Sequence, residues 1–92
     1  MLGDIRTCLD MVGGMSGVAL ALGQPERSAR LLGAVSAVRD ASGIRMSGSR
    51  DLLLHIARET RAALPEATFD AAWRTGRELS FSAAQADALA LA

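Results

Sequence analysis

Few side chains in this sequence are of the types that bind metal ions or act as nucleophiles. His55 is the single histidine, and neither a second histidine nor the single cysteine, Cys8, stands at metal-ligand spacing from it. Combinations of serine, histidine and acid arise by chance in any serine-rich helical protein, so they do not indicate a catalytic triad. We therefore expect no metal site and no catalytic residue, and we expect His55 to be a partly buried structural residue.

Two further patterns imitate catalytic or cofactor sites. Glu59 and Glu66 could form an acid/base pair, but no pocket can be inferred around them, and solvated ion pairing is the better interpretation. Gly43 and Gly48, followed by Ser49, have the spacing of a phosphate-binding loop. That motif needs a lysine, and the chain has none, so we expect a connection between helices and no cofactor.

The arginines are the most regular chemical feature. All ten basic residues are arginines, ten acidic residues bring the net charge to zero, and three arginine pairs have members three residues apart: Arg27 with Arg30, Arg58 with Arg61, and Arg74 with Arg77. Such pairs can bind phosphates or carboxylates. Acidic residues stand at neighbouring helical positions, so we expect solvated helix faces, with a protein partner or a nucleic acid as alternatives.

Helices must position these residues, because no segment alternates as a strand does. Apolar residues recur at three- and four-residue steps over 2–22, and Gly23 and Pro25 then predict a helix end followed at once by a second helix, which stops at Gly43. A Gly- and Ser-rich loop over 43–49 precedes a third helix to about Leu64. Pro65 opens a short fourth helix, and Ser80 or Ser82 caps a fifth. The sequence predicts an all-α class with about five helices.

The same periodicity predicts the buried face of each helix. We expect Leu54 to lie outside, among Arg58 and Arg61, Phe69 to stack on Trp73, and Glu26 to pair with Arg30 one turn on. The expected inner residues are Ile5, Cys8, Leu9, Val12, Met15, Ala19 and Leu22, then Ser28, Leu31, Leu32, Val35 and Val38, then Leu52, Leu53, Ile56, Thr60, Ala63 and Leu64, and finally Phe69, Ala72, Trp73 and Gly76.

Small residues also recur on the first helix. Gly13, Gly17 and Ala21 are four residues apart, and each mid-helix glycine costs up to about 1 kcal/mol relative to alanine. Close packing inside a helical array would explain the pattern; a weak spot with no role is the alternative. The first two helices also match a tetratricopeptide register with Gly23 at the turn, although the usual tryptophan and tyrosine of that repeat are absent.

Two stretches carry a family resemblance: LGQPERSARLLGAV at 22–35 and ALPEATFDAAWRTGRELS at 63–80. They resemble the C-terminal tetratricopeptide-like arm of large actinobacterial regulators, among them LuxR-type and SARP-type transcriptional regulators and related signal-transduction ATPases. The resemblance implies a helical arm that senses a ligand or protein and restrains a nucleotide-binding switch domain. This chain would be the end of such an arm. The loop over 44–50 departs from the family, which is usually richer there in proline and acid.

Length and composition limit the size of the domain and indicate where its apolar surface is buried. Ninety-two residues allow one small domain over 1–92, and half of them are hydrophobic, so we expect apolar surface to be buried against a protein partner or a second copy. The longest uncharged stretch, 11–25, is too short to cross a membrane, and acidic residues before it argue against a secretory leader. Together with the single cysteine, these two observations favour a cytoplasmic location for the protein.

We therefore expect a non-catalytic interaction or regulatory module and not an enzyme. A small nucleic-acid-binding protein and a small-ligand-binding domain are the alternatives. The residues expected to make the interaction are Gly13, Gly17, Ala21, Leu54, Arg58 and Arg61.

Overall fold

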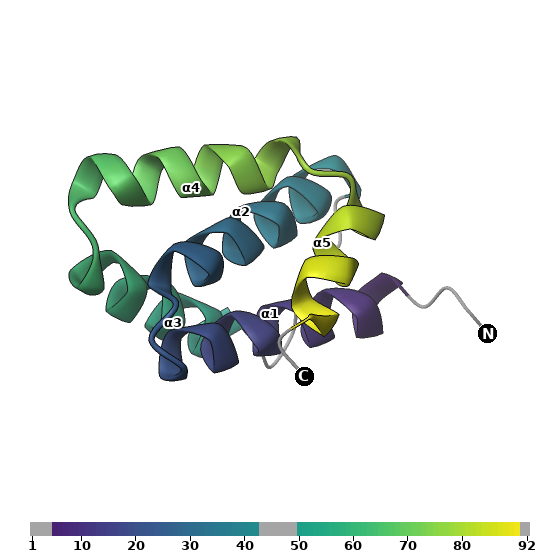
Figure 1. The fold of residues 1–92 in the computed structure, drawn as a ribbon. Helices are drawn as coiled ribbons and strands as arrows, with labels where there is room; N and C mark the ends of the chain where they lie inside the picture. Colours follow the sequence, from purple (N-terminus) through teal and green to yellow (C-terminus); the bar gives the residue numbers. More distant parts are fainter. Residues whose placement is uncertain (1–4, 43–49, 91–92) are drawn as a thin grey trace.

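The computed structural model describes the backbone of residues 5–42 and 50–90 and the side chains of 11–41 and 51–90. This part of the chain forms helices and no strand, which confirms the all-α class (Figure 1). The helices are α1 (Ile5–Ala21), α2 (Pro25–Ser42), α3 (Arg50–Ala63), α4 (Glu66–Glu78) and α5 (Phe81–Leu89). The predicted loop Gly43–Ser49 and the side chains of Ile5, Cys8 and Leu9 lie outside the described residues.

The predicted helix boundaries are confirmed where local chemistry sets them. Gly23 has φ 78°, and the N–H groups of Gly23 and Gln24 donate to the carbonyls of Leu20 (3.1 Å) and Ala19 (2.8 Å). This pair of bonds is the Schellman motif, which satisfies the last carbonyls of α1 and needs a left-handed residue. Pro25 is then the first residue of α2.

The last two helices begin as expected too. Pro65 is the N-cap of α4, and Ser80 is the N-cap of α5. The Ser80 hydroxyl accepts a hydrogen bond from the Ala83 N–H at 3.1 Å, so of the two candidate caps Ser80 is used and Ser82 is not.

The helices assemble around α2. In Figure 1, α4 runs along one side of α2 and α1 along the other, and the short α5 lies across α1 and α2. The directions alternate along the chain, so α1 and α3 point one way and α2 and α4 the other. Such up-and-down hairpins are what a helical array contains, but the tetratricopeptide register itself stays a prediction.

The core lies where α1, α2 and α5 meet. Val12, Leu31, Val35 and Ala88 form its buried cluster, and Phe69 of α4 is the largest fully buried side chain of the described residues. Two buried hydroxyls join α2 to α3: Ser28 and Thr60 lie 2.9 Å apart, and both are 0% exposed. A buried polar group needs such a partner, since leaving it unpaired costs about 1–3 kcal/mol.

Three residues expected in the core are exposed instead. Leu22 is 56% exposed, Leu52 is 55% exposed, and Ala63 is exposed. All three stand at the ends of helices: Leu22 follows α1, Leu52 is in the first turn of α3, and Ala63 is its last residue. Helical periodicity gave the correct face, but no neighbouring helix covers it at those ends.

The backbones of α2 and α4 are in direct contact at two glycines. Gly33 and Gly76 are both buried, and each lies directly against the backbone of the other helix. A Cβ on Gly76 would overlap the carbonyl oxygen of Arg30, and a Cβ on Gly33 would overlap that of Trp73. Glycine is therefore required at both positions for the two backbones to approach.

Candidate functional site

His55 is not in the environment we predicted. Its side chain is 66% exposed, and Nε2 lies 3.6 Å from Oε1 of Glu59, one turn further along α3. The expectation of partial burial is wrong, because His55 lies on the outer side of α3. Glu66 is also exposed, at the start of α4.

The structure tests the metal pattern only within the residues it describes. No three His, Cys, Asp or Glu side chains come together as possible metal ligands in the ranges the structure describes. The phosphate-loop pattern of Gly43, Gly48 and Ser49 lies outside those ranges.

The glycines of α1 contact the same chain. Gly13 is buried, and a Cβ on it would lie 2.8 Å from Cδ2 of Leu53. Gly17 is half-buried, with the corresponding position 3.1 Å from Cδ1 of Ile56. The expected close packing inside a helical array is therefore confirmed for these two glycines, and α3 of the same chain, not a partner helix, occupies the space beside them. Ala21, the last residue of α1, is exposed.

The first arginine pair holds α5 in place. Nε of Arg27 and Nε of Arg30 each lie 2.9 Å from a different carboxylate oxygen of Asp87. Arg30 thus pairs with α5, and the expected pair with Glu26 is not formed. Sequence spacing missed this contact because Asp87 is 57 residues from Arg30.

This arrangement changes the acidity of Asp87. Burial alone would raise the pKa of the carboxyl, but the hydrogen bond and charge of Arg30, and then those of Arg27, outweigh it and hold the pKa below its usual value. A carboxyl with a lowered folded-state pKa contributes stability above its unfolded-state pKa. That stability is lost as the pH falls through the folded-state value.

We therefore expect Asp87→Asn to destabilise the fold at neutral pH by about 1–2 kcal/mol, because it removes the charge that both arginines bind. The difference from wild type should shrink as the pH falls from about 4, the usual pKa of an unfolded aspartate, through the lower pKa of folded Asp87. Thermal unfolding followed by circular dichroism across this pH range measures both effects. Asp40→Asn is the control, since the Asp40–Arg77 pair (3.2 Å) is more exposed and should contribute little. A constant difference at every pH would contradict the assignment.

The other arginines divide between internal contacts and the surface. The guanidinium of Arg61 lies 4.2 Å from the ring centre of Phe69, a cation–π contact. Phe69 in turn stacks on Trp73 as predicted, with ring centres 5.8 Å apart. Arg77 donates to Ser36 and Asp40 on α2. Arg58 is exposed and has no ion pair within the described residues.

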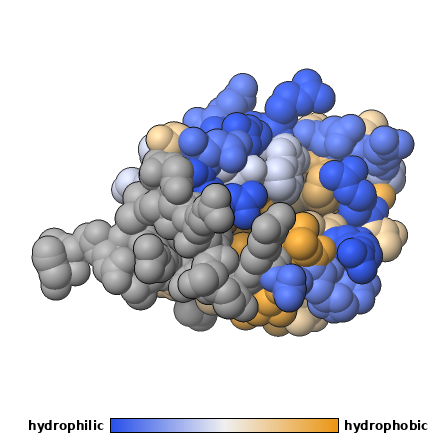
Figure 2. Space-filling view, turned by 180° about the vertical axis from the view of Figure 1, so that it is seen from behind, coloured by the Kyte–Doolittle hydropathy of each residue, from blue (hydrophilic) through white to orange (hydrophobic). Residues whose placement is uncertain are grey.

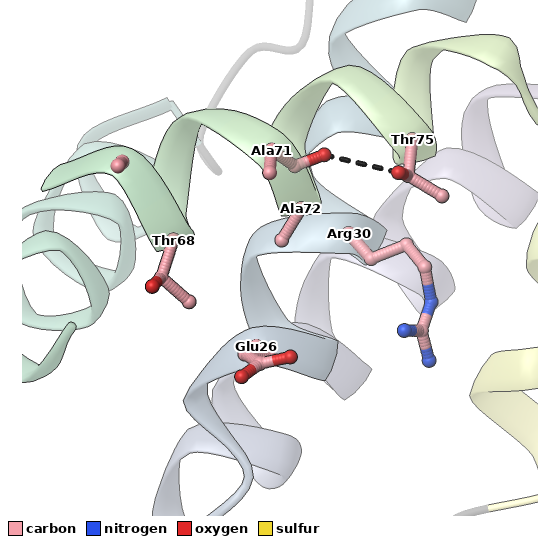
Figure 3. A pocket seen from close by; sticks show the side chains of 7 residues that line it. Glu26, Arg30, Thr68, Ala71, Ala72 and Thr75 are labelled. Carbon is pink, nitrogen blue, oxygen red and sulfur yellow. Dashed lines mark hydrogen bonds between the residues drawn. The ribbon is translucent and has the colours of Figure 1, made fainter. Parts of the chain in front are cut away.

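A shallow groove of about 400 Å³ runs between α2 and α4. Figure 3 shows Glu26 and Arg30 on the α2 side and Thr68, Ala71, Ala72 and Thr75 on the α4 side. The polar groups here are largely occupied: Arg30 binds Asp87, and the Thr75 hydroxyl donates to the Ala71 carbonyl at 3.0 Å. The groove therefore offers a small ligand little beyond Glu26 and the Thr68 hydroxyl.

A second hollow, of about 140 Å³, is apolar and lies between α2, α3 and α4. Leu32 and Val35 of α2, Leu53 and Ala57 of α3, and Trp73 of α4 line it, with Ser36 and Arg39 as its polar members. Leu54 also lines it, while remaining 53% exposed as predicted. We call this hollow together with Leu54 the α3 docking surface.

The surrounding surface is mixed in character. Figure 2 shows hydrophobic side chains between hydrophilic ones on the face seen from behind. Within the described ranges, no helix has both the length and the apolar character needed to cross a membrane.

Comparison of the chain with protein-family models, with curated proteins and with solved structures finds no match. Function must therefore be inferred from the residues of the chain itself. Of the six expected interaction residues, Leu54 lies beside an apolar hollow, and Ala21 and Arg58 are exposed. Gly13 and Gly17 lie against α3, and Arg61 contacts the Phe69 ring. Sequence reasoning missed the hollow because three separate helices build it.

Proposed function

We propose that the chain is a non-catalytic interaction module, located in the cytoplasm, that binds an apolar helix of a protein partner on the α3 docking surface. A regulatory arm of the kind found in LuxR-type and SARP-type regulators would act in this way. The single observation that supports the proposal is Leu54, a large apolar side chain 53% exposed beside an apolar hollow. Exposed apolar surface of this kind often marks a protein interaction site.

The hollow has the size for such a contact. A cavity of about 150 Å³ lined by aliphatic and aromatic side chains holds a six-carbon ring, so a volume of about 140 Å³ suits one leucine-sized side chain. Trp73 also lines the hollow, and tryptophan is enriched among the residues that contribute most to binding at protein interfaces.

The surface is also held firmly in place. Leu53 and Ile56 pack onto the glycines of α1, and Thr60 bonds to Ser28 of α2. These contacts anchor one side of α3 and leave Leu54 on the other. A rigid surface loses little entropy on binding, which favours affinity.

Site-specific photo-crosslinking tests the proposal. Benzoyl-phenylalanine in place of Leu54 should form an adduct with a defined protein, identified by mass spectrometry. The same residue in place of Thr75, which is exposed beside the α2–α4 groove, should form none. Leu54→Glu should weaken binding of the purified partner at least about tenfold, as loss of a hot-spot side chain does.

Two results would contradict the proposal. One is no adduct from position 54, or an equal yield of the same adducts from positions 54 and 75. The other is binding of the identified partner that is unchanged by Leu54→Glu. A protein adduct from position 75 alone would place the contact at the α2–α4 groove and not at the α3 docking surface.

A further inference from the structure

A row of three exposed side chains runs along α3 on either side of the α3 docking surface: Asp51, Leu54 and Arg58, of which Leu54 alone belongs to that surface. They are three and four residues apart, so they lie along one side of the helix. The row therefore reads acid, leucine, base from the start of α3 towards its end. Neither Asp51 nor Arg58 has an ion pair within the described residues, whereas His55 and Glu59 contact one another.

We propose that this row binds the same row of a second copy of the chain, with the two α3 helices antiparallel. The inference rests on the proposed function and names its partner. In a two-fold symmetric contact, if residue i of the first copy meets residue j of the second, then residue j of the first copy meets residue i of the second. With Leu54 near the axis, Asp51 faces Arg58 of the second copy, and Arg58 faces Asp51 of the second copy.

Charge selects this orientation. The acid precedes Leu54 by three residues and the base follows it by four, which places them at nearly equal distances on opposite sides of the leucine. A parallel pairing would place Asp51 against its own equivalent and Arg58 against its own equivalent. Like charges across an interface are unfavourable, so only the antiparallel arrangement is complementary to itself.

The apolar part of the surface is self-complementary as well. Leu54 stands beside the hollow formed by Val35, Ala57 and Trp73, so each copy has both a projecting leucine and a hollow next to it. A contact through one helix of each copy lies at or below the low end of stable interfaces, which bury about 1,200 Å² or more. The dimer should therefore dissociate on dilution.

Charge reversal tests the pairing by analytical ultracentrifugation over a range of concentrations. Asp51→Arg alone and Arg58→Asp alone each place two like-charge pairs in the dimer, and each should weaken self-association roughly tenfold. An equimolar mixture of the two variants restores both opposite-charge pairs, so it should form a heterodimer. The double variant Asp51→Arg/Arg58→Asp should pair with itself. Low ionic strength is used because salt screens exposed charges.

Both substitutions are at exposed positions, and thermal unfolding of each variant checks that the fold is kept. A wild-type chain that remains a monomer at every concentration overturns the self-pairing, as does a dimer on which charge reversal has no effect or which the mixed variants do not restore. The proposed function is judged separately: a monomer that still forms an adduct from position 54 with another protein keeps the function and loses only the second copy.

Discussion

Gly76→Ala should lower the free energy of unfolding by about 2–3 kcal/mol, although alanine is the better helix former. The new Cβ would overlap the carbonyl oxygen of Arg30 and lie 3.0 Å from its Cα. Both atoms belong to the backbone of α2, which has no flexible side chain to turn aside. The two helices would have to separate, and the packing between them would be lost. Chemical denaturation followed by circular dichroism measures the change.

Gly14→Ala is the matched control. Gly14 is also inside a helix, but it is exposed, and a Cβ there would meet no atom within 4 Å. The same substitution should therefore stabilise the fold, by up to about 1 kcal/mol. The two variants thus differ in the sign of their effect. Stabilisation by both would show that α2 and α4 do not approach as closely as described.

Phe69→Ala should cost about 3–5 kcal/mol, the usual range for removing a buried aromatic side chain. Phe69 is 1% exposed and makes two further contacts. Its ring centre lies 5.8 Å from that of Trp73 and 4.2 Å from the guanidinium of Arg61. Folded domains have a total stability of about 5–15 kcal/mol, and a small one falls near the lower limit. Most of the stability should therefore be lost. Fluorescence of Trp73, the single tryptophan, and circular dichroism should report the same transition.

Phe69→Leu separates volume from aromatic contacts. Leucine fills much of the same space, so this variant should lose only about 1–2 kcal/mol, most of it from the stacking and cation–π contacts. A loss from Phe69→Ala below about 1 kcal/mol would contradict the burial of Phe69. Equal losses from the two variants would show that the aromatic contacts, and not the filled volume, dominate at this site.

The fold and the proposed docking surface depend on each other through α2. The α2 backbone packs against α4 at Gly33, and the Ser28 hydroxyl forms a hydrogen bond with α3. Two arginines of α2 form ion pairs with Asp87 of α5. The floor of the apolar hollow is also part of α2, through Leu32 and Val35. Substitutions in the α2–α4 contact should therefore alter both stability and binding, whereas those at Asp51, Leu54 or Arg58 should alter binding alone.

The sequence by itself determined the helices and those of their boundaries that local chemistry sets. Gly23, Pro25, Pro65 and Ser80 act through bonds and sterics within a few residues, and such local interactions are contained in a short window of sequence. The stacking of Phe69 on Trp73 and the exposure of Leu54 are likewise set by positions on one helix. These features were predicted and are confirmed.

The tertiary structure alone decided how the helices use their surfaces. The sequence offered Glu26 as a partner for Arg30, but Arg30 binds Asp87. The sequence left the neighbour of Gly13 open, and the structure places Leu53 there. Nothing in the sequence pattern marked Gly33, although α4 can approach α2 so closely only because this residue is a glycine. Helical periodicity specifies the side of a helix on which a residue lies. Which neighbour covers that side, and where the cover ends, depends on contacts between residues far apart in the chain, and only the packed arrangement supplies them.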